Sequence, residues 1–473
     1  MQLKNRPAIS ALAVVLTAPL LYVIDIFIIN MAIPAIQTGL SASDGETQLV
    51  IAGYLLGSAA FLITGGRAGD YLGKKKVFFW GMFWFTLTSC ICGMAQTILQ
   101  LNAARFFQGM SSAFMVPQSI AFIQVLFPEP EERAKAIGWY GITLSIAAII
   151  GQILGGYLVE TRFLIEGWRL IFFINLPVGL AALWTIDRYL DETEKEKSIG
   201  FDYSGSVILT LGLGTLIYAI TEGQEQHWPL WSIGLIVSGI LVLVFFVRDQ
   251  RKKQWENRSP LMDMSLFRNR EFNIGLGVVL FHFMLHTAYL LMSAVYLQSG
   301  LGISALECGM YFLLHALLFM ISSLVASKQL VKYGKNVLFT GLFIIFLSFV
   351  LQSLFFTAVT PPFVSIMLIG LYGLGNGMVL PFLLNIVLNN VPQKHAGIAS
   401  GIFSTFQQTA SAFGISIIGG VFYSVIEGKS AQEYTLGIEY GLIINMICLG
   451  IVSIMLYRLP GGLKKRTGII GTD

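Results

Sequence analysis

The chain has 473 residues, of which 55% are hydrophobic and 12% are charged, with a formal net charge of +4. Soluble domains carry about 25% charged residues, so this composition excludes a water-soluble globular protein. The small net charge is spread over the polar connectors, and we expect no nucleic-acid partner.

Apolar segments of about 20 residues or more recur along the chain, the length that a helix needs to cross roughly 30 Å of hydrocarbon. In lipid the backbone must bond to itself, so these segments predict helices and an all-α membrane protein. The first segment is too long for a signal peptide and lacks a cleavage site, so we expect it to be retained. The fourteen predicted transmembrane spans are 8–36, 47–71, 77–96, 98–127, 134–159, 167–187, 204–222, 229–247, 271–298, 304–327, 336–357, 362–390, 395–425 and 437–458.

The lysine and arginine residues are distributed unevenly among the connectors. If the N-terminus is cytoplasmic, 26 of the 30 fall on the cytoplasmic side, whereas Arg162, Arg169 and Lys429 fall outside and Arg105 lies within the membrane. Cytoplasmic connectors are enriched in Lys and Arg, so we predict a multi-pass protein of the cell membrane with both termini in the cytoplasm.

Internal similarity indicates a duplicated architecture. The segment Gly73–Gly81 after the second span is similar to Gly334–Gly341 after the tenth, and longer connectors at 187–203 and 248–270 bracket the seventh and eighth spans. We therefore predict six-helix bundles at residues 1–190 and 271–460, two inserted helices at 191–270 and a cytoplasmic tail at 461–473. Duplicated halves are a transporter design, with the binding site between them near mid-membrane.

An acid and a base lie alone at similar depths in the outer half of the membrane. Asp25 is in the first span and Arg105 in the fourth. A charged residue at the centre of a membrane helix costs about 2.5–3.5 kcal/mol on insertion scales, and such residues are usually functional. One interpretation is that Asp25 takes a proton from outside and releases it inside, while Arg105 pairs with it in one state. The alternative is a permanent ion pair that holds two helices together.

Four segments match motifs of one transporter family. They are Asp25-Ile-Phe-Ile-Ile-Asn-Met-Ala-Ile-Pro34, the loop Gly66-Arg-Ala-Gly-Asp-Tyr-Leu-Gly-Lys-Lys75, Leu101-x3-Arg105-x2-Gln108-Gly109 and Trp168-Arg-x3-Phe-x-Asn175-x-Pro177. Over essentially its whole length the chain resembles the major facilitator superfamily, and within it the fourteen-helix drug:proton antiporter family. The chain departs from the family pattern at Tyr71, where arginine is usual, and at Gln152, which replaces a proline.

The resemblance assigns expected roles to three sets of residues. Asp25 and Arg105 would couple transport to protons. The loop after the second span would act in gating, through Gly66, Asp70, Gly73, Lys74 and Lys75. The fifth span would pack closely on a helix of the other half, through Gly151, Gln152, Gly155 and Gly156.

Polar residues within the apolar spans are candidates for the substrate cavity. The histidines could relay protons, bind an anionic group or simply bond across helices as neutral side chains. The second half shows no clear acid within the membrane, which favours a neutral or weakly acidic amphipathic substrate over a cation. The candidates are Asn30, Gln118, His282, His286, His315, Asn376, Asn385, Gln407 and Gln408.

These observations together predict a proton-coupled exporter of hydrophobic or amphipathic small molecules that works by alternating access. A proton-coupled importer or symporter is the first alternative, and a membrane-embedded enzyme or receptor is the second. No P-loop or catalytic cluster is present, and Cys90, Cys92, Cys308 and Cys448 lie in apolar segments without metal-ligand spacing. We expect no enzymatic activity, no cofactor and no metal, and a monomer whose partners are a small-molecule substrate, protons and lipid.

Overall fold

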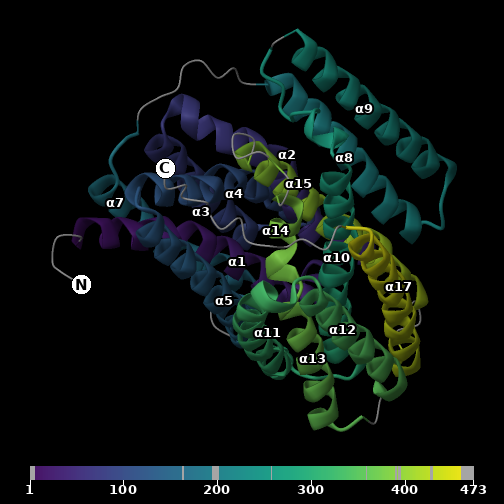
Figure 1. Cartoon of the computed structure of the whole chain (residues 1–473). Helices are drawn as coiled ribbons and strands as arrows, with labels where there is room; N and C mark the ends of the chain where they lie inside the picture. The colour runs from purple at the N-terminus through teal and green to yellow at the C-terminus, as the bar shows by residue number, and fades with distance from the viewer. Residues whose placement is uncertain are drawn as a thin grey trace.

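The computed structural model describes residues 6–161, 165–193, 202–256, 258–357, 360–388, 391, 396–426 and 430–459. The side chains of residues 6–8, 70, 130, 131, 134, 331 and 396–398 are outside this description. Fourteen helices in the described part are long and apolar enough to cross a membrane, which confirms the predicted fold class and number of spans. Their arrangement is shown in Figure 1.

The helices follow one another along the chain with short connections. They are α1 (Arg6–Leu40), α2 (Asp44–Leu72), α3 (Lys74–Met94), α4 (Ile98–Leu126), α5 (Pro130–Glu160), α6 (Gly167–Phe173), α7 (Asn175–Tyr189), α8 (Tyr203–Glu225), α9 (Leu230–Trp255), the 3₁₀ turn η2 (Leu266–Arg268), α10 (Arg270–Val295), the π turn η3 (Tyr296–Gly300), α11 (Ala305–Tyr333), α12 (Asn336–Phe355), α13 (Pro362–Gly377), the 3₁₀ turn η4 (Leu380–Phe382), α14 (Leu383–Leu388), α15 (Ala396–Phe413), the π turn η6 (Gly414–Gly419), α16 (Gly420–Val425) and α17 (Ala431–Tyr457).

Local signals fix several of the helix ends. The Ser43 hydroxyl accepts a hydrogen bond from the amide of Glu46, and the Glu46 carboxylate accepts one from the Ser43 amide, which is a capping box at the start of α2. Gly73 ends α2 and begins α3 with φ of +103°, a conformation that glycine adopts without steric cost. The predicted loop after the second span is therefore a one-residue turn.

Some predicted spans differ from the observed helices. We predicted that the eighth span ends at residue 247, but α9 continues to Trp255 because polar residues can extend a helix beyond the apolar layer. The sixth span is two helices that meet at Ile174. The twelfth changes from α13 through η4 to α14 around Pro381, which has no amide hydrogen for a helical bond.

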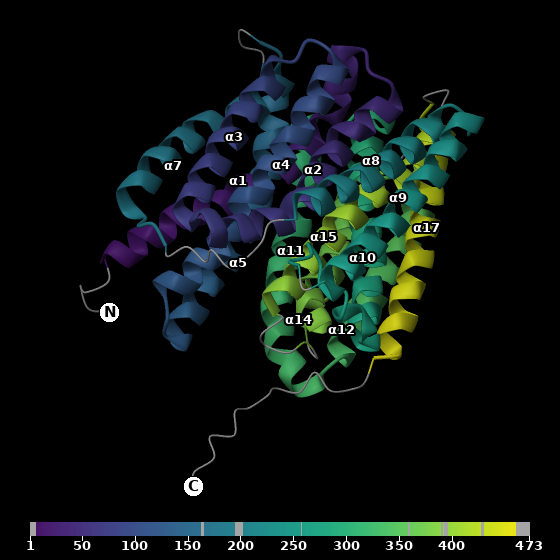
Figure 2. The same cartoon turned by 90° about the horizontal axis from the view of Figure 1, so that it is seen from above.

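The helices pack as two groups and a hairpin. Helices α1 to α7 contact one another, as do α10 to α17, and Figure 2 shows these groups side by side. Helix α8 packs on α2, and α9 packs on α8. This hairpin therefore follows the first group in sequence but lies at the edge of the molecule, as Figure 1 shows.

A buried carboxylate fastens this hairpin to the connector that follows it. Asp202 accepts hydrogen bonds from Lys253 Nζ (2.8 Å), Gln250 Nε2 (2.8 Å) and the amides of Gly205 (2.8 Å) and Leu261 (3.1 Å). Burial raises the pKa of Asp202, but the hydrogen bonds from Lys253, Gln250 and Gly205 outweigh it and hold the pKa below its usual value. The ionised carboxylate therefore stabilises the folded chain at this point.

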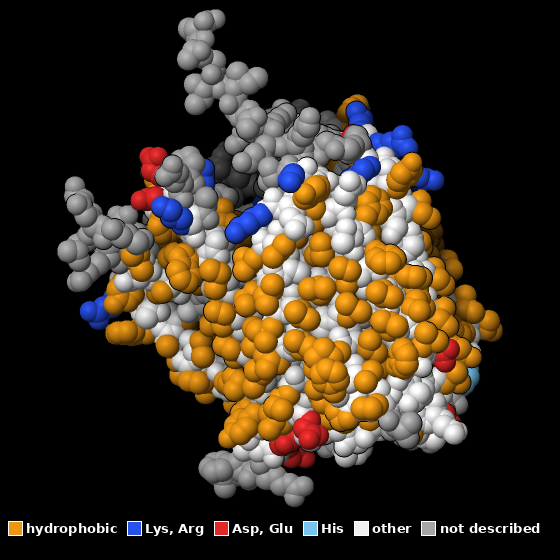
Figure 3. Space-filling view, turned by 60° about the horizontal axis from the view of Figure 1, so that its bottom comes forward, with side chains coloured by type: hydrophobic (Ala, Val, Ile, Leu, Met, Phe, Trp, Pro, Cys, Tyr) orange, Lys and Arg blue, Asp and Glu red, His pale blue; other side chains and the backbone are white. Residues whose placement is uncertain are grey.

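The outer surface carries a wide apolar band. Figure 3 shows hydrophobic side chains across the middle of one face, with Lys and Arg gathered mainly at one edge. Exposed Trp84, Leu241, Phe245 and Phe343 belong to helices that cross this band. Such a surface requires lipid around it, and the chain is a multi-pass membrane protein.

The two groups meet at one side of the membrane. We call the side where α1 begins and α17 ends the terminal side. On the opposite side, the Leu306 amide of α11 donates to Glu160 Oε1 at the end of α5 (2.7 Å). Between η6 and α8, the Thr221 hydroxyl donates to Ser416 Oγ (2.7 Å). Helices α2 and α15 are also in contact, and this contact continues toward the terminal side as far as Ile63 of α2 and Gly401 of α15.

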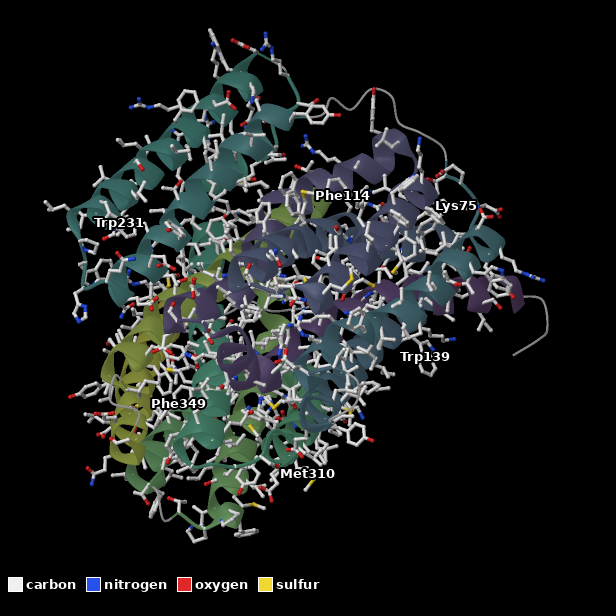
Figure 4. All side chains as sticks on the ribbon, turned by 180° about the vertical axis from the view of Figure 1, so that it is seen from behind. Lys75, Phe114, Trp139, Trp231, Met310 and Phe349 are labelled. Carbon is white, nitrogen blue, oxygen red and sulfur yellow. The ribbon has the colours of Figure 1, made fainter. Side chains whose placement is uncertain are left out.

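Toward the terminal side α5 loses its partner. Between Lys135 and Ile146 the helix has one buried residue, Ala136, and a Cβ added at Gly138 would meet nothing within 4 Å. Trp139 is 57% exposed and extends away from the ribbon in Figure 4. The two groups are therefore closed on the opposite side and separated at α5 on the terminal side.

Candidate functional site

Asp25 and Arg105 form an ion pair inside the first group of helices. Arg105 Nη1 lies 2.6 Å from Asp25 Oδ2, and the side chains are 0% and 1% exposed. The pair joins α1 to α4. Buried charges persist in proteins when they are paired and hydrogen-bonded, and both conditions hold for this pair.

Amide groups add further hydrogen bonds to both charges. Gln108 bridges them, because its Nε2 donates to Asp25 Oδ1 (2.9 Å) and its Oε1 accepts from Arg105 Nη1 (2.8 Å). Asn175 of α7 donates to Asp25 Oδ1 at 3.4 Å, and Arg105 Nε donates to the Val50 carbonyl of α2 at 3.1 Å. Four helices therefore contribute to this site, which we call the ion-pair site.

Aromatic rings separate the ion-pair site from the second group. The guanidinium carbon of Arg105 lies 4.3 Å from the ring centre of Tyr54, and Tyr54 stacks on Tyr22 at 6.1 Å. The Tyr22 hydroxyl accepts a hydrogen bond from Gln408 of α15. One line of contacts thus runs from the second group through two tyrosines to the charged pair.

Some polar atoms at this site have spare hydrogen-bonding capacity. Arg105 Nη2, the Tyr54 hydroxyl and Asn175 Oδ1 are buried and have no hydrogen-bond partner among the described residues. Unpaired buried polar atoms are costly. Each of these atoms can form a further hydrogen bond.

A second polar group, which we call the histidine cluster, lies in the second group of helices. It consists of His282 and His286 of α10, His315 of α11, and Tyr372 and Asn376 of α13. His286 Nδ1 lies 2.7 Å from the Tyr372 hydroxyl and 3.2 Å from Asn376 Nδ2, and His282 Nε2 lies 2.9 Å from Asn376 Oδ1. His315 stacks on Tyr372 with ring centres 5.6 Å apart.

The expected gating loop contacts the end of α7. Lys75 Nζ lies 3.2 Å from Asp187 Oδ1, and the amide of Lys74 donates to Thr193 Oγ1 at 3.1 Å. Figure 4 shows Lys75 at this edge of the molecule. Gly66 faces α4, where an added Cβ would lie 3.8 Å from Pro117. The side chain of Asp70 lies outside the described residues, so its gating role stays a prediction.

The glycines of α5 have two different neighbours. We expected all of them to face the other half, but a Cβ added at Gly151 or Gly155 would lie 2.9 Å from a carbonyl oxygen of α1. Gly156 alone of the three packs on α11, at Ala305 and Leu306, and Gln152 meets Gly309 there through its carbonyl oxygen (2.7 Å to an added Cβ). The reason is that α5 lies between α1 and α11, so residues four apart share the face toward α1.

The other cavity candidates are scattered. Asn30 donates to the Ile26 carbonyl of its own helix (3.2 Å), and Gln118 is buried and donates to the Gly65 carbonyl of α2 (2.8 Å). Both face the interior of the first group. Asn385 is exposed on α14, and Gln407 is half-buried on α15 beside Gln408.

The sequence argument missed two ligands of the ion pair. Gln108 and Asn175 both stand in the quoted motifs but were not expected at the site. For Gln108 a signal was present, because a residue three positions after Arg105 lies on the same helix face. Asn175 offered no such signal, since its position depends on how α7 packs on α1.

Comparison with known proteins gives consistent matches. The family model described as Major Facilitator Superfamily matches residues 15–203 and 186–415. A protein named "Probable actinorhodin transporter" from Streptomyces coelicolor is 32% identical over 90% of this chain and 74% of its own length. "Multidrug resistance protein Stp" from Mycobacterium tuberculosis is 30% identical over 84% of this chain and 73% of its own length.

Solved structures share the fold at low sequence identity. The crystal structure of a D-xylose-proton symporter has a TM-score of 0.65 at 12% identity and covers 93% of this chain and 97% of that one. A bacterial homolog of the human lysosomal transporter Spinster, in an inward-facing and unoccupied conformation, has a TM-score of 0.66 at 14% identity and covers 96% and 97%.

Proposed function

The chain belongs to the major facilitator superfamily, and from this premise we propose that it exports hydrophobic or amphipathic small molecules in exchange for protons. The observation that carries the proposal is the buried Asp25–Arg105 pair, at 2.6 Å, in a fold with duplicated groups of helices. Relatives named for transport or multidrug resistance support export over import. The energy source is the proton gradient, with no cofactor and no enzymatic step.

We propose that residues 1–190 and 271–460 rock against each other, with 191–270 as a peripheral hairpin and 461–473 as a cytoplasmic tail. The basic residues favour the cytoplasm for both termini and for the terminal side. On that assignment the described conformation opens at α5 toward the cytoplasm and is closed outside, ready to accept a molecule for export. The protein acts as a monomer in the cell membrane.

In the coupling step, protonation of Asp25 removes the negative charge that holds Arg105. Losing one partner of a buried ion pair costs about 3–5 kcal/mol. One proton that moves through about 100 mV and one pH unit releases about 2.3 and about 1.4 kcal/mol respectively. The two energies are similar, so a proton gradient can drive the pair apart and let α1 and α4 shift.

The remaining steps assign roles to the inter-group contacts. Through the hydrogen bond between Gln408 and Tyr22, a movement at the ion-pair site would be transmitted to α15. The contact of Gly156 with α11 closes the opposite side and must separate when the carrier opens outward. Lys75, Gly73 and Lys74 would hold the loop after α2 against α7 during these movements.

The test is a panel of amphipathic compounds added to everted membrane vesicles. We expect a transported compound to dissipate an imposed pH gradient in vesicles with the wild-type chain and not in vesicles with Asp25→Asn. Counterflow in oriented vesicles fixes the direction of transport. Compound-dependent proton movement that is undiminished in Asp25→Asn would contradict the proposal.

A further inference from the structure

The histidine cluster is built on the helices of the second group that correspond in order to those of the ion-pair site in the first. Asp25 and His286 lie on the first helices of their groups, and Arg105 and Asn376 lie on the fourth. Tyr54 is the eleventh residue of α2, and His315 is the eleventh residue of α11, the second helix of the later group. The two sites therefore use corresponding helices of the two groups, although Asn376 is the fifteenth residue of α13 and Arg105 the eighth of α4, and their chemistry differs.

The hydrogen-bond pattern, with Asn376 Nδ2 facing His286, fits a neutral His286. Its Nδ1 accepts from the Tyr372 hydroxyl (2.7 Å) and from Asn376 Nδ2 (3.2 Å), so Nδ1 carries no hydrogen and the ring hydrogen is on Nε2. The Asn376 orientation is fixed in turn by His282, whose Nε2 donates to Asn376 Oδ1 (2.9 Å). Neither His282 Nδ1 nor either ring nitrogen of His315 has a partner among the described residues.

Among the described residues, no ion pair or hydrogen bond joins the histidine cluster to an acid: Asp25 of α1 is paired with Arg105, and Glu433 and Glu439 of α17 lie near the start of that helix. The titratable groups that face His286 are His282 on its own helix, His315 of α11 and Tyr372 of α13. The described residues of α13, α14 and α15 include no Asp, Glu, Lys or Arg. Arg105, by contrast, has Asp25 beside it.

His286 is within reach of a ligand. It is half-buried, whereas His282 and the residues from Ala288 to Leu297 are buried. Its helix, α10, packs on α1 of the first group and on α14, α15 and α17 of the second. His286 is thus a partly accessible side chain on a helix that contacts both groups.

We propose that the histidine cluster binds an acidic group of the transported molecule, a carboxylate or phenolate, together with a proton on His286. The inference rests on the proposed function, because it assumes that the cluster meets the transported molecule. The anion supplies the counter-ion that the second group lacks, so proton and anion bind as a pair and neither binds well alone.

The cluster can accept this proton without moving its helices. The new hydrogen bonds from Nδ1 to the Tyr372 oxygen once the hydroxyl rotates, and the Asn376 amide turns its oxygen toward His286. His282 then takes its other tautomer, with its hydrogen on the unpartnered Nδ1, so that its Nε2 accepts from Asn376 Nδ2. Nε2–H of His286 then donates to the anion.

The test measures equilibrium binding of radiolabelled 1-naphthoate and 1-naphthamide to the full chain in lipid nanodiscs. The naphthoate is ionised between pH 5.5 and 7.5, so its pH dependence reports the protein. Because one proton binds with the anion, we expect naphthoate affinity to fall about ten-fold for each unit rise in pH and naphthamide affinity to stay constant. This comparison needs no variant.

Two variants locate the effect. His286→Gln keeps a hydrogen-bonding side chain but cannot take the proton, so naphthoate affinity should lose its pH dependence, while His227→Gln, outside the cluster, behaves as wild type. Equal pH dependence for both probes, absence of naphthoate binding or an unchanged slope in His286→Gln would overturn the proposal. Asp25→Asn separates the two proposals: it should keep the naphthoate slope even if proton-driven export proves absent.

Discussion

Replacing Asp25 by asparagine tests whether the buried ion pair couples transport to protons or only holds helices together. The substitution mimics the protonated carboxyl in shape and removes its charge. Both interpretations predict a loss of stability, so stability alone cannot separate them. They differ in what happens when the partner charge is removed as well.

The expected loss follows from the contacts of the pair. The asparagine of the variant could still accept the hydrogen bond from Arg105, which lies 2.6 Å from Asp25 Oδ2 in the wild-type chain, but its amide nitrogen would then replace the Oδ1 that accepts from Gln108 at 2.9 Å. The Arg105 guanidinium would keep Tyr54 at 4.3 Å but lose its counter-ion. We therefore expect the low end of the range for breaking a buried pair, about 3 kcal/mol in the free energy of unfolding.

The assay is a double-mutant cycle with Arg105→Gln. Unfolding of the purified protein by sodium dodecyl sulfate in mixed micelles gives the stability of wild type, each single variant and the double variant. We expect the double variant to recover about 2 kcal/mol relative to Asp25→Asn, because no buried charge is left unpaired. Proton-driven transport in proteoliposomes should stay absent in all three variants.

Substrate exchange without a pH gradient provides the control. Exchange needs the carrier to reorient with substrate but needs no proton release, so the double variant should retain it. If Asp25→Asn drives transport from a pH gradient at the wild-type rate, the coupling role is refuted. Recovery of gradient-driven transport together with stability in the double variant would show that the pair is a structural link.

Three further changes probe the contacts around the site. Gly156→Ala places a methyl against α11 at Ala305 and Leu306, where overpacking by about 1–3 kcal/mol should favour the outward-open state. Spin-label distances between the opposite-side ends of α5 and α11 should lengthen, and should not in Gly138→Ala, whose site is open. Gln408→Leu removes the bond to Tyr22 and should slow gradient-driven transport about two- to ten-fold, with an unchanged rate counting against this link. Asp202→Asn should lower the free energy of unfolding at pH 7 by about 1–3 kcal/mol. Because folding lowers the pKa of Asp202, this difference from wild type should vanish as the pH falls below the folded pKa, and a difference that persists in acid would contradict the assignment.

Hydropathy and charge were enough to predict the fold class and the number of helices. The length of apolar segments is set by the membrane, and backbone polar groups leave no alternative to helix. Helix ends were less predictable. The polar end of α9 lies outside the apolar layer, so the hydropathy of the sequence does not indicate where this helix ends. The break at Ile174 lies within a continuous apolar segment, so hydropathy does not indicate it either.

For the site residues, the sequence predicted how deep each one lies in the membrane but not the direction in which its side chain points. Asp25 and Arg105 lie at similar depths, which indicated that they could meet. The rotation of each helix about its axis depends on its neighbours, and sequence periodicity is weak where lipid and protein are both apolar. For this reason the predicted partner of Gly151 was wrong, and Asn175 was missed although it lies within a matched motif.

The ion-pair site and the histidine cluster differ in whether the protein itself supplies a counter-ion, and this difference gives them different responses to a proton. In the first group the protein supplies both charges, so the resting state is complete and a proton disturbs it. In the second group the described residues that hydrogen-bond within the histidine cluster include no acid, so the resting state is neutral and an acidic ligand with a proton would complete it. A proton therefore weakens the first site and strengthens ligand binding at the second. Gln408 of α15, in the second group, donates a hydrogen bond to Tyr22 beside the ion-pair site. This contact gives a physical connection through which a change at one site could affect the other.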